Sequence, residues 1–288
     1  MSIFTFYSDG FRKSVRSMRT IVLLWVVSLA GSLLVVAPFE RNIGKLLDGS
    51  IGPELMYDGF NIDIFADIMH AVLPAMASFS ISFFLVTAII FVVNTFITAG
   101  LFRILAGNWK KPYKRNTFLK GADRGFGGFL FVAIATVLII IILFLLIFVL
   151  PMVIAGLAGA GYSLMVVFGV VLATIMVAVI PLVLLIADYA RVLLTNDKYL
   201  GPFRAMIDAL RLIRKGLFRN WLIMLIILAS SAVIGFISVR IVTYSTLRSG
   251  MGLFLLLILS QLFVFLRTWI KVIRYGTVTS LYESGKKK

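Results

Sequence analysis

Residues Phe129–Pro151 read FLFVAIATVLIIIILFLLIFVLP and contain no charged side chain. A helix rises about 1.5 Å per residue, so about 20 apolar residues cross the roughly 30 Å hydrocarbon layer of a membrane. The apolar residues of this stretch are continuous, whereas the strands of a transmembrane barrel alternate apolar and polar residues. The stretch therefore predicts a transmembrane helix.

Five further stretches are equally apolar and free of Asp, Glu, Lys and Arg. With the first, the predicted spans are 20–38, 74–101, 129–151, 164–187, 221–239 and 251–266. Hydrophobic residues make up 61% of the chain and its mean hydropathy is +1.07, as expected if most of it lies in lipid. Backbone groups at that depth have no water to bind and must pair within helices. We therefore predict an all-α polytopic membrane protein, with residues 1–288 as one membrane domain.

Basic side chains indicate the orientation of the spans. Four of the seven segments outside the spans contain 24 of the 28 Lys and Arg residues, and these four alternate with the other three. The remaining bases are Arg41, Lys45, Arg240 and Arg248. Lys and Arg near spans are retained on the cytoplasmic side. We therefore expect both termini and segments 103–127 and 188–220 in the cytoplasm, and the carboxylate-rich segment 39–73 outside.

The net charge of +16 raises the alternative of a nucleic-acid-binding protein. The bases border the spans, however, where the positive-inside bias and attraction to anionic lipids account for them. We therefore expect anionic lipids of the cytoplasmic leaflet, and not nucleic acid, as their partners. The chain has no Cys, which excludes disulfides, thiolate metal sites and a cysteine nucleophile.

A basic, partly apolar stretch precedes each odd-numbered span, at 6–19, 116–126 and 202–219. In the third stretch, apolar residues recur at helical spacing opposite basic ones, which is typical of amphipathic helices in the membrane interface. Its candidate lipid-headgroup residues are Arg204, Arg211, Arg214, Lys215 and Arg219. The pattern predicts three hairpins, each built of an interfacial helix, a span, an outer turn and a second span.

Seven short stretches carry a family resemblance. They are GFR at 10–12, LMYDGF at 55–60, AGLF at 99–102, FLKG at 118–121, ADYAR at 187–191, ALR at 209–211 and QLFVFLR at 261–267. Together they resemble an uncharacterised family of bacterial six-span integral membrane proteins. They are more distantly similar to the membrane domain associated with glycerophosphodiester phosphodiesterases. The resemblance implies the bacterial cytoplasmic (inner) membrane and the three-hairpin plan, and it brings no catalytic residues.

The remaining polar residues do not match a catalytic or metal-binding pattern. A single His excludes the His-Glu-x-x-His motif, and no span contains the carboxylates of an aspartyl protease. Asp63, Asp67 and His70 share one face of a predicted outer helix and could ligate a divalent ion, but no fourth ligand has a diagnostic spacing. An amphipathic helix with a solvated acidic face is the favoured interpretation. We therefore expect no catalytic residues, no cofactor and no metal.

The glycine-rich stretch 156–161 predicts a tight outer turn.

Asp188 and Arg191 lie at the inner end of the fourth span and are spaced to pair on one helix face. Two interpretations stay open. The pair is a gate for an ion or a proton, or it is a structural brace, with Arg267 or Arg103 as a further interhelical partner. We favour the brace, because a base lies one turn away and the carboxylate is at the end of a span.

Arg267, Lys271 and Arg274 extend the sixth span at spacings of four and three residues and form one basic stripe. The stripe is a second candidate for binding lipid phosphate. The alternative is that its side chains only extend from the helix end to the membrane surface, as long basic side chains commonly do.

Three classes of function remain. The first is a non-enzymatic, lipid-contacting accessory or scaffold protein of the bacterial envelope, with an envelope protein as a further candidate partner. The second is a small-solute or ion transporter, which the absence of charges within the spans disfavours. The third is the membrane module of a lipid-metabolising enzyme that acts with a separate partner.

The topology has a direct test, because the chain lacks Cys. In intact cells, a membrane-impermeant maleimide should label Ser50→Cys and spare Asn116→Cys, since the first residue is expected outside and the second inside. Labelling of both after permeabilisation is the control for reactivity. The reverse pattern in intact cells would show that the orientation is wrong.

Overall fold

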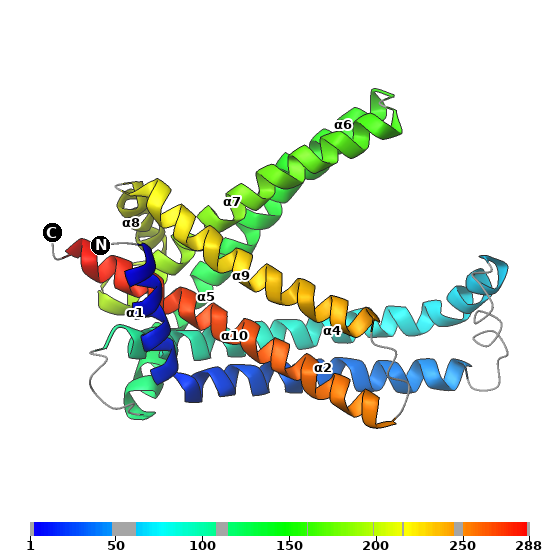
Figure 1. Ribbon diagram of the computed structural model, residues 1–288, viewed down its shortest axis with the longest axis horizontal. Helices are drawn as coiled ribbons and strands as arrows, with labels where there is room; N and C mark the ends of the chain where they lie inside the picture. The colour runs from blue at the N-terminus through cyan, green and yellow to red at the C-terminus, as the bar shows by residue number, and fades with distance from the viewer. Residues whose placement is uncertain are drawn as a thin grey trace. The chain divides into compact units, whose positions relative to one another are not determined.

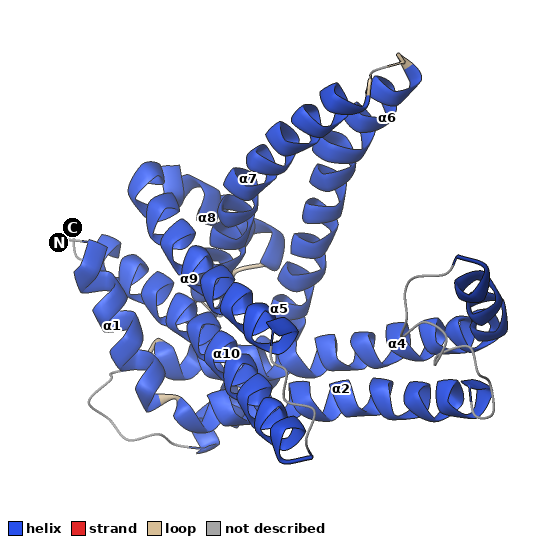
Figure 2. Cartoon of the chain, turned by 45° about the vertical axis from the view of Figure 1, so that its right-hand side comes forward, coloured by secondary structure: helices blue, strands red, loops and turns tan. Residues whose placement is uncertain are grey.

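The computed structural model describes residues 3–47, 62–107, 115–159, 161–197, 199–214, 216–244 and 250–286. All regular secondary structure in these ranges is helical (Figure 2). The outer stretch 55–60 that contributes to the family resemblance lies outside them.

Six helices in the described ranges are long and apolar enough to cross a membrane, which confirms the polytopic all-α prediction. They are α2 (Met18–Leu47), α4 (Ile62–Leu105), α5 (Arg115–Phe144) with its continuation to Leu157, α7 (Tyr162–Asn196), α9 (Leu217–Tyr244) and α10 (Gly250–Lys286). Helices α5, α7 and α10 extend well beyond the predicted spans at the ends that the sequence assigns to the cytoplasm, which we call the inner ends.

The described chain forms two compact units, one of residues 23–94 and one of residues 1–22 with 95–288. In the smaller unit, α2 and α4 approach closely at Gly31, where an added Cβ would lie 2.8 Å from Cγ1 of Ile90. The larger unit contains the candidate site residues whose side chains are described below, whereas Asp63, Asp67 and His70 belong to the smaller unit. The expectation of a single membrane domain stays a prediction.

Two of the three predicted interfacial stretches are separate short helices, α1 (Ile3–Arg16) and α8 (Pro202–Arg214). Each is separated from the following span by a tight turn, in which Ser17 N–H donates to the Ser14 carbonyl and Gly216 N–H to the Ile213 carbonyl. The second stretch, 116–126, has no such turn and continues directly into the span as the first part of α5. The repeated plan is therefore less regular than the sequence rhythm predicted.

Helix α5 contains a π-helical turn, η1 (Leu145–Val149), before α6 (Leu150–Leu157). Leu150 N–H donates to the Leu145 carbonyl, which widens the helix immediately before Pro151. The wider turn accommodates a ring that lacks an N–H and would otherwise collide with the preceding turn. The glycine-rich turn follows, and Gly159 adopts a φ of 73°, which few other residues tolerate. Helices α5 and α7 are thereby joined as an antiparallel hairpin with α6 at its tip (Figure 1).

Pro181 lies inside α7 and prevents a regular hydrogen bond there. The indole N–H of Trp221, at the start of α9, donates to the Ala178 carbonyl at 2.9 Å, one turn before the proline. A carbonyl near the interruption is thus satisfied by a neighbouring helix, as membrane helices with proline require. The contact gives Pro181 a structural explanation and fixes α9 against α7.

The stretch before each odd-numbered span packs against the inner end of an even-numbered span. The start of α5 lies on α4, where the Phe118 ring contacts Gly100 and the Arg103 side chain contacts Gly121. Helix α8 packs on α7 through a face that includes the buried residues Ala205 and Ala209. Helix α1 packs on α10 and so joins the beginning of the chain to its end (Figure 1).

Helices α1 and α10 cross closely at two glycines. Cβ atoms cannot be accommodated at Gly10 or Gly276, because each would come within 2.9 Å of the backbone of the other helix. Trp269 Nε1–H donates to Ser14 Oγ at 2.9 Å, and Lys13 Nζ binds both carboxylate oxygens of Glu283 at 3.0 Å. The aromatic side chains of Phe102, Phe129 and Tyr275, all nearly inaccessible, join α4, α5 and α10 beside this crossing.

Replacing Gly10 by Ala should destabilise the protein by about 1–3 kcal/mol, because the new methyl group overlaps Thr277 and the α10 backbone. Gly127→Ala is the matched control, since nothing lies within 4 Å of its added Cβ. The free energy of unfolding in mixed micelles measures both. Equal stability of the two variants would contradict the close crossing of α1 and α10.

Candidate functional site

Asp188 is fully buried near the inner end of α7 and lies between two arginines. Arg191, one turn along α7, places Nη1 2.8 Å from Oδ1 of Asp188. Arg274, from α10, places Nε 2.9 Å from Oδ2. The second contact is an ion pair without hydrogen-bond alignment, since the Nε–H is not directed at the oxygen. The cluster joins two helices that are far apart in the sequence.

The cluster is buried, and its burial determines how it affects the free energy of folding. Removing a carboxylate and two guanidinium groups from water is costly, and mutual attraction repays the cost only in good geometry. Both arginine side chains retain only small exposed fractions, 12% for Arg191 and 10% for Arg274. Loss of the carboxylate would leave two nearby cations without their shared partner. The cluster can therefore act as a brace between α7 and α10.

The interhelical partner of Asp188 differs from the two that the sequence suggested. Arg103 instead donates from Nη1 to the Thr195 carbonyl at 3.1 Å, and Arg267 is exposed in a neighbouring pocket. Arg274 belongs to the basic stripe that the sequence predicted. The sequence did not predict that Asp188 is its partner. The spacing along α10 shows which bases share a face, and only the packing of α10 on α7 shows which of them reaches Asp188.

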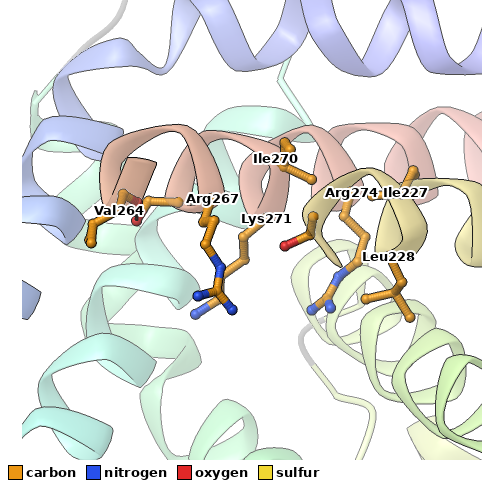
Figure 3. A pocket seen from close by; sticks show the side chains of 9 residues that line it. Ile227, Leu228, Val264, Arg267, Ile270, Lys271 and Arg274 are labelled. Carbon is orange, nitrogen blue, oxygen red and sulfur yellow. Dashed lines mark hydrogen bonds between the residues drawn. The ribbon is translucent and has the colours of Figure 1, made fainter. Parts of the chain in front are cut away.

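A pocket of about 350 Å³ lies between α9 and α10 and is lined by Arg267, Lys271 and Arg274. Figure 3 shows the three side chains projecting to the same side of α10, with Ile227 and Leu228 of α9 opposite. The Arg267 side chain lies near α9, because its Cζ would be at van der Waals distance, 3.9 Å, from a Cβ added at Gly235. Arg267 and Lys271 are exposed, whereas Arg274 is buried against Asp188. The stripe therefore presents two accessible cations over an apolar wall.

Helix α8 has three distinct faces. Ala205, Ala209 and Ile213 are buried against the protein. Apolar side chains beside them are exposed, with 67% of Phe203 and 40% of Leu210 accessible. The third face carries the exposed bases Arg204 and Arg211, and Arg214 and Arg219 are exposed near the helix end. This is the arrangement expected of a helix that contacts protein, acyl chains and headgroups at once.

Helix α1 repeats the same three faces. The sequence Asp9-Gly10-Phe11-Arg12 corresponds to Asp208-Ala209-Leu210-Arg211. In each helix the small residue is buried, the apolar residue is about 40% exposed (43% for Phe11 and 40% for Leu210), and the arginine is exposed. The guanidinium of Arg219 also lies 5.5 Å from the centroid of the Phe6 ring, which connects the start of α9 to α1. The similar four-residue stretches 9–12 and 208–211 could have predicted this resemblance of α1 to α8 from the sequence.

The remaining predicted residues are placed as follows. Asp63, Asp67 and His70 belong to the first part of the continuous helix α4, and their side chains lie outside the described structure. Lys215 also lies outside the described residues. Within the described part of the chain, no group of three or more His, Cys, Asp or Glu side chains is positioned to hold a metal ion.

Comparisons with protein families, with curated proteins and with solved structures find no match to this chain. The resemblance to a six-span bacterial family therefore stays a prediction.

Asp188→Asn should destabilise the protein in detergent by about 3–5 kcal/mol, because it leaves buried arginines uncompensated. Asp208→Asn is the matched control. Asp208 also pairs with a base three residues away, at 3.4 Å from Arg211, but in a largely exposed position. Its replacement should change stability by no more than about 0.5 kcal/mol. Unfolding free energies of the two variants in the same micelles provide the measurement.

A double-mutant cycle separates the two arginines. Combining Asp188→Asn with Arg274→Gln should restore part of the lost stability, since the uncompensated cation is removed together with its partner. The corresponding cycle with Arg191→Gln measures the intrahelical pair. Strict additivity in both cycles would show that Asp188 does not brace α7 against α10.

Proposed function

We propose that this chain is a non-enzymatic integral membrane protein that contacts lipid and serves as an accessory or scaffold component of the bacterial envelope. Its termini are placed in the cytoplasm, and its expected partners are anionic lipids of the inner leaflet, with an envelope protein as a further candidate. No role in binding nucleic acid is proposed. The single observation that carries the proposal is the three-faced character of α1 and α8.

The three faces support a role at the membrane surface. A helix that only completed a protein core would bury its apolar residues, yet Phe203 is 67% exposed and Phe4 is 82% exposed. A helix in the cytosol would not need these apolar residues beside its bases. An interfacial position accounts for both, because acyl chains cover the apolar face and headgroup phosphates attract the arginines.

The pocket between α9 and α10 supports the same role. Its two exposed cations, Arg267 and Lys271, lie beside apolar residues such as Val264 and Ile227. A phosphate group bound there would meet charge on one side and hydrocarbon on the other. This environment fits the boundary between the headgroup and the acyl chains of an anionic lipid.

A small-solute or ion transporter is the second candidate. One observation favours this function. The buried Asp188 cluster lies beside the pocket between α9 and α10, and Arg274 belongs to both. Against it, the carboxylate is already compensated by two arginines, and close helix contacts such as Gly10–Gly276 favour a fixed arrangement. The membrane module of a lipid-metabolising enzyme remains compatible with lipid contact, but no described residue favours it specifically.

Spin labels on adjacent residues of α8 test the proposal in reconstituted vesicles that contain anionic lipid. Oxygen concentrates in acyl chains and should reach a label at Leu210→Cys more readily than one at Arg211→Cys. A water-soluble nickel chelate should reach the label at Arg211→Cys more readily, because that side chain is on the basic face. The pair Phe11→Cys and Arg12→Cys in α1 should give the same contrast.

High accessibility to the nickel chelate at all four positions would place α1 and α8 in water and would contradict lipid contact. The competing function has its own outcome. A stable Asp188→Asn protein that loses a measurable solute flux in proteoliposomes would replace the scaffold proposal with a transporter.

A further inference from the structure

A second cavity, of about 790 Å³, lies at the inner ends of three helices and is separate from the pocket between α9 and α10. It is enclosed by residues of α4, α5 and α7 and by the loop that leads to α8, and we call it the inner cavity. Its charged lining residues are Arg103, Lys120, Arg124 and Asp197. Three cations against one carboxylate give the cavity an excess of positive charge.

Arg103 lines the inner cavity and is fixed there by two contacts. Its aliphatic carbons lie over Gly121 of α5, where an added Cβ would be only 2.7 Å from Cγ of Arg103. Its Nη1 donates to the Thr195 carbonyl of α7 at 3.1 Å. A guanidinium has five N–H donors, and this bond uses one of them. Arg103 is therefore held in position by a bond that leaves the rest of its guanidinium to interact with a ligand.

Lys120 and Arg124 are four residues apart on α5 and line the inner cavity from the same helix face. Within the described residues, both are exposed and neither forms an ion pair. Asp197 is the carboxylate in the lining, and its Oδ1 accepts a hydrogen bond from the backbone N–H of Tyr199 at 3.0 Å. The cavity thus contains two cations whose charge is not neutralised locally.

The lining changes from polar to apolar along the helices. The bases and Thr117 are at the inner ends of α4 and α5, whereas Phe129 and Gly128 lie further along α5, toward its membrane-spanning part. Glycines at 121, 125 and 128 belong to the α5 wall of the cavity, and the side chains of Arg103 and Leu194 pack against Gly121 and Gly128. A ligand that fits this gradient has an anionic group on the cytoplasmic side and an apolar part directed into the membrane.

We propose that the inner cavity binds the phosphate group of an anionic phospholipid, with Arg103, Lys120 and Arg124 as its ligands. The inference rests on the proposed lipid-contacting role and adds a defined site to it. Lipid phosphate and free phosphate share the chemistry that these three bases recognise. The apolar end of the cavity favours the lipid.

Titration of the purified full-length protein in maltoside micelles tests the site. Dihexanoylphosphatidylglycerol, added below its critical micelle concentration, should raise the thermal denaturation midpoint in a saturable manner. Inorganic phosphate and dihexanoylphosphatidylcholine at equal concentrations should have much smaller effects. The double variant Lys120→Gln/Arg124→Gln should weaken phosphatidylglycerol binding by about tenfold or more, since each base contributes a charge-assisted hydrogen bond.

Arg115→Gln is the matched control, because Arg115 is an exposed base of the same helix that does not line the cavity. It should bind phosphatidylglycerol like the unchanged protein. Equal binding by the double variant would overturn the proposal, provided that its unliganded denaturation midpoint shows a folded protein. Equal protection by inorganic phosphate, lost in the double variant, would support the phosphate site and assign it to a soluble anion.

The result is independent of the interfacial role of α8. The spin-label contrast between Leu210 and Arg211 should be unchanged in the cavity double variant, since neither residue lines the cavity. Absence of saturable phosphatidylglycerol binding to the unchanged protein, with the spin-label contrast intact, would refute the inner site alone. Loss of the contrast in the unchanged protein would refute the proposed function itself.

Discussion

The carboxylate of Asp188 is the charge on which the inner end of the larger unit depends. It binds Arg191 within α7 and Arg274 of α10, so it fixes the rotation of one helix relative to the other. The same stretch of α10, from Val272 to Leu281, is buried, and α1 crosses it at Gly276. The ion pair from Asp188 to Arg274 therefore joins α7 to the stretch of α10 on which the first helix of the chain packs. Without it, two cations at the edge of the hydrocarbon would lack a partner of opposite charge.

Burial in the larger unit is concentrated at the inner ends of the helices. Side chains such as Ser14, Thr277 and Thr279 are enclosed there and make local hydrogen bonds, whereas apolar residues nearer the outer ends, such as Leu157 and Phe236, are more than half exposed. Most of the buried polar and charged side chains described in the larger unit are therefore on the side that the basic residues assign to the cytoplasm.

The sequence predicted the six spans and the class of the fold because length and apolar composition decide them directly. It also predicted a turn at 156–161, where Gly159 has a positive φ. It did not predict that the second interfacial stretch is continuous with α5, nor that Arg274 reaches Asp188. The inner cavity was missed for the same reason. Arg103, Lys120 and Arg124 come from two helices, and spacing within one helix contains no information on its rotation against another.

The basic groups of the larger unit occupy comparable positions because one structural arrangement recurs. Each even-numbered span continues past its apolar stretch, and the stretch before an odd-numbered span packs on that extension. Bases of the two packed helices then lie near the end of the apolar surface. Arg211 of α8 and Lys120 of α5 are two such exposed bases. Lipid phosphates lie at that same level. The surfaces proposed for headgroup contact are therefore next to those used for helix packing, so a lipid bound at the inner ends would also stabilise the contacts between these helices.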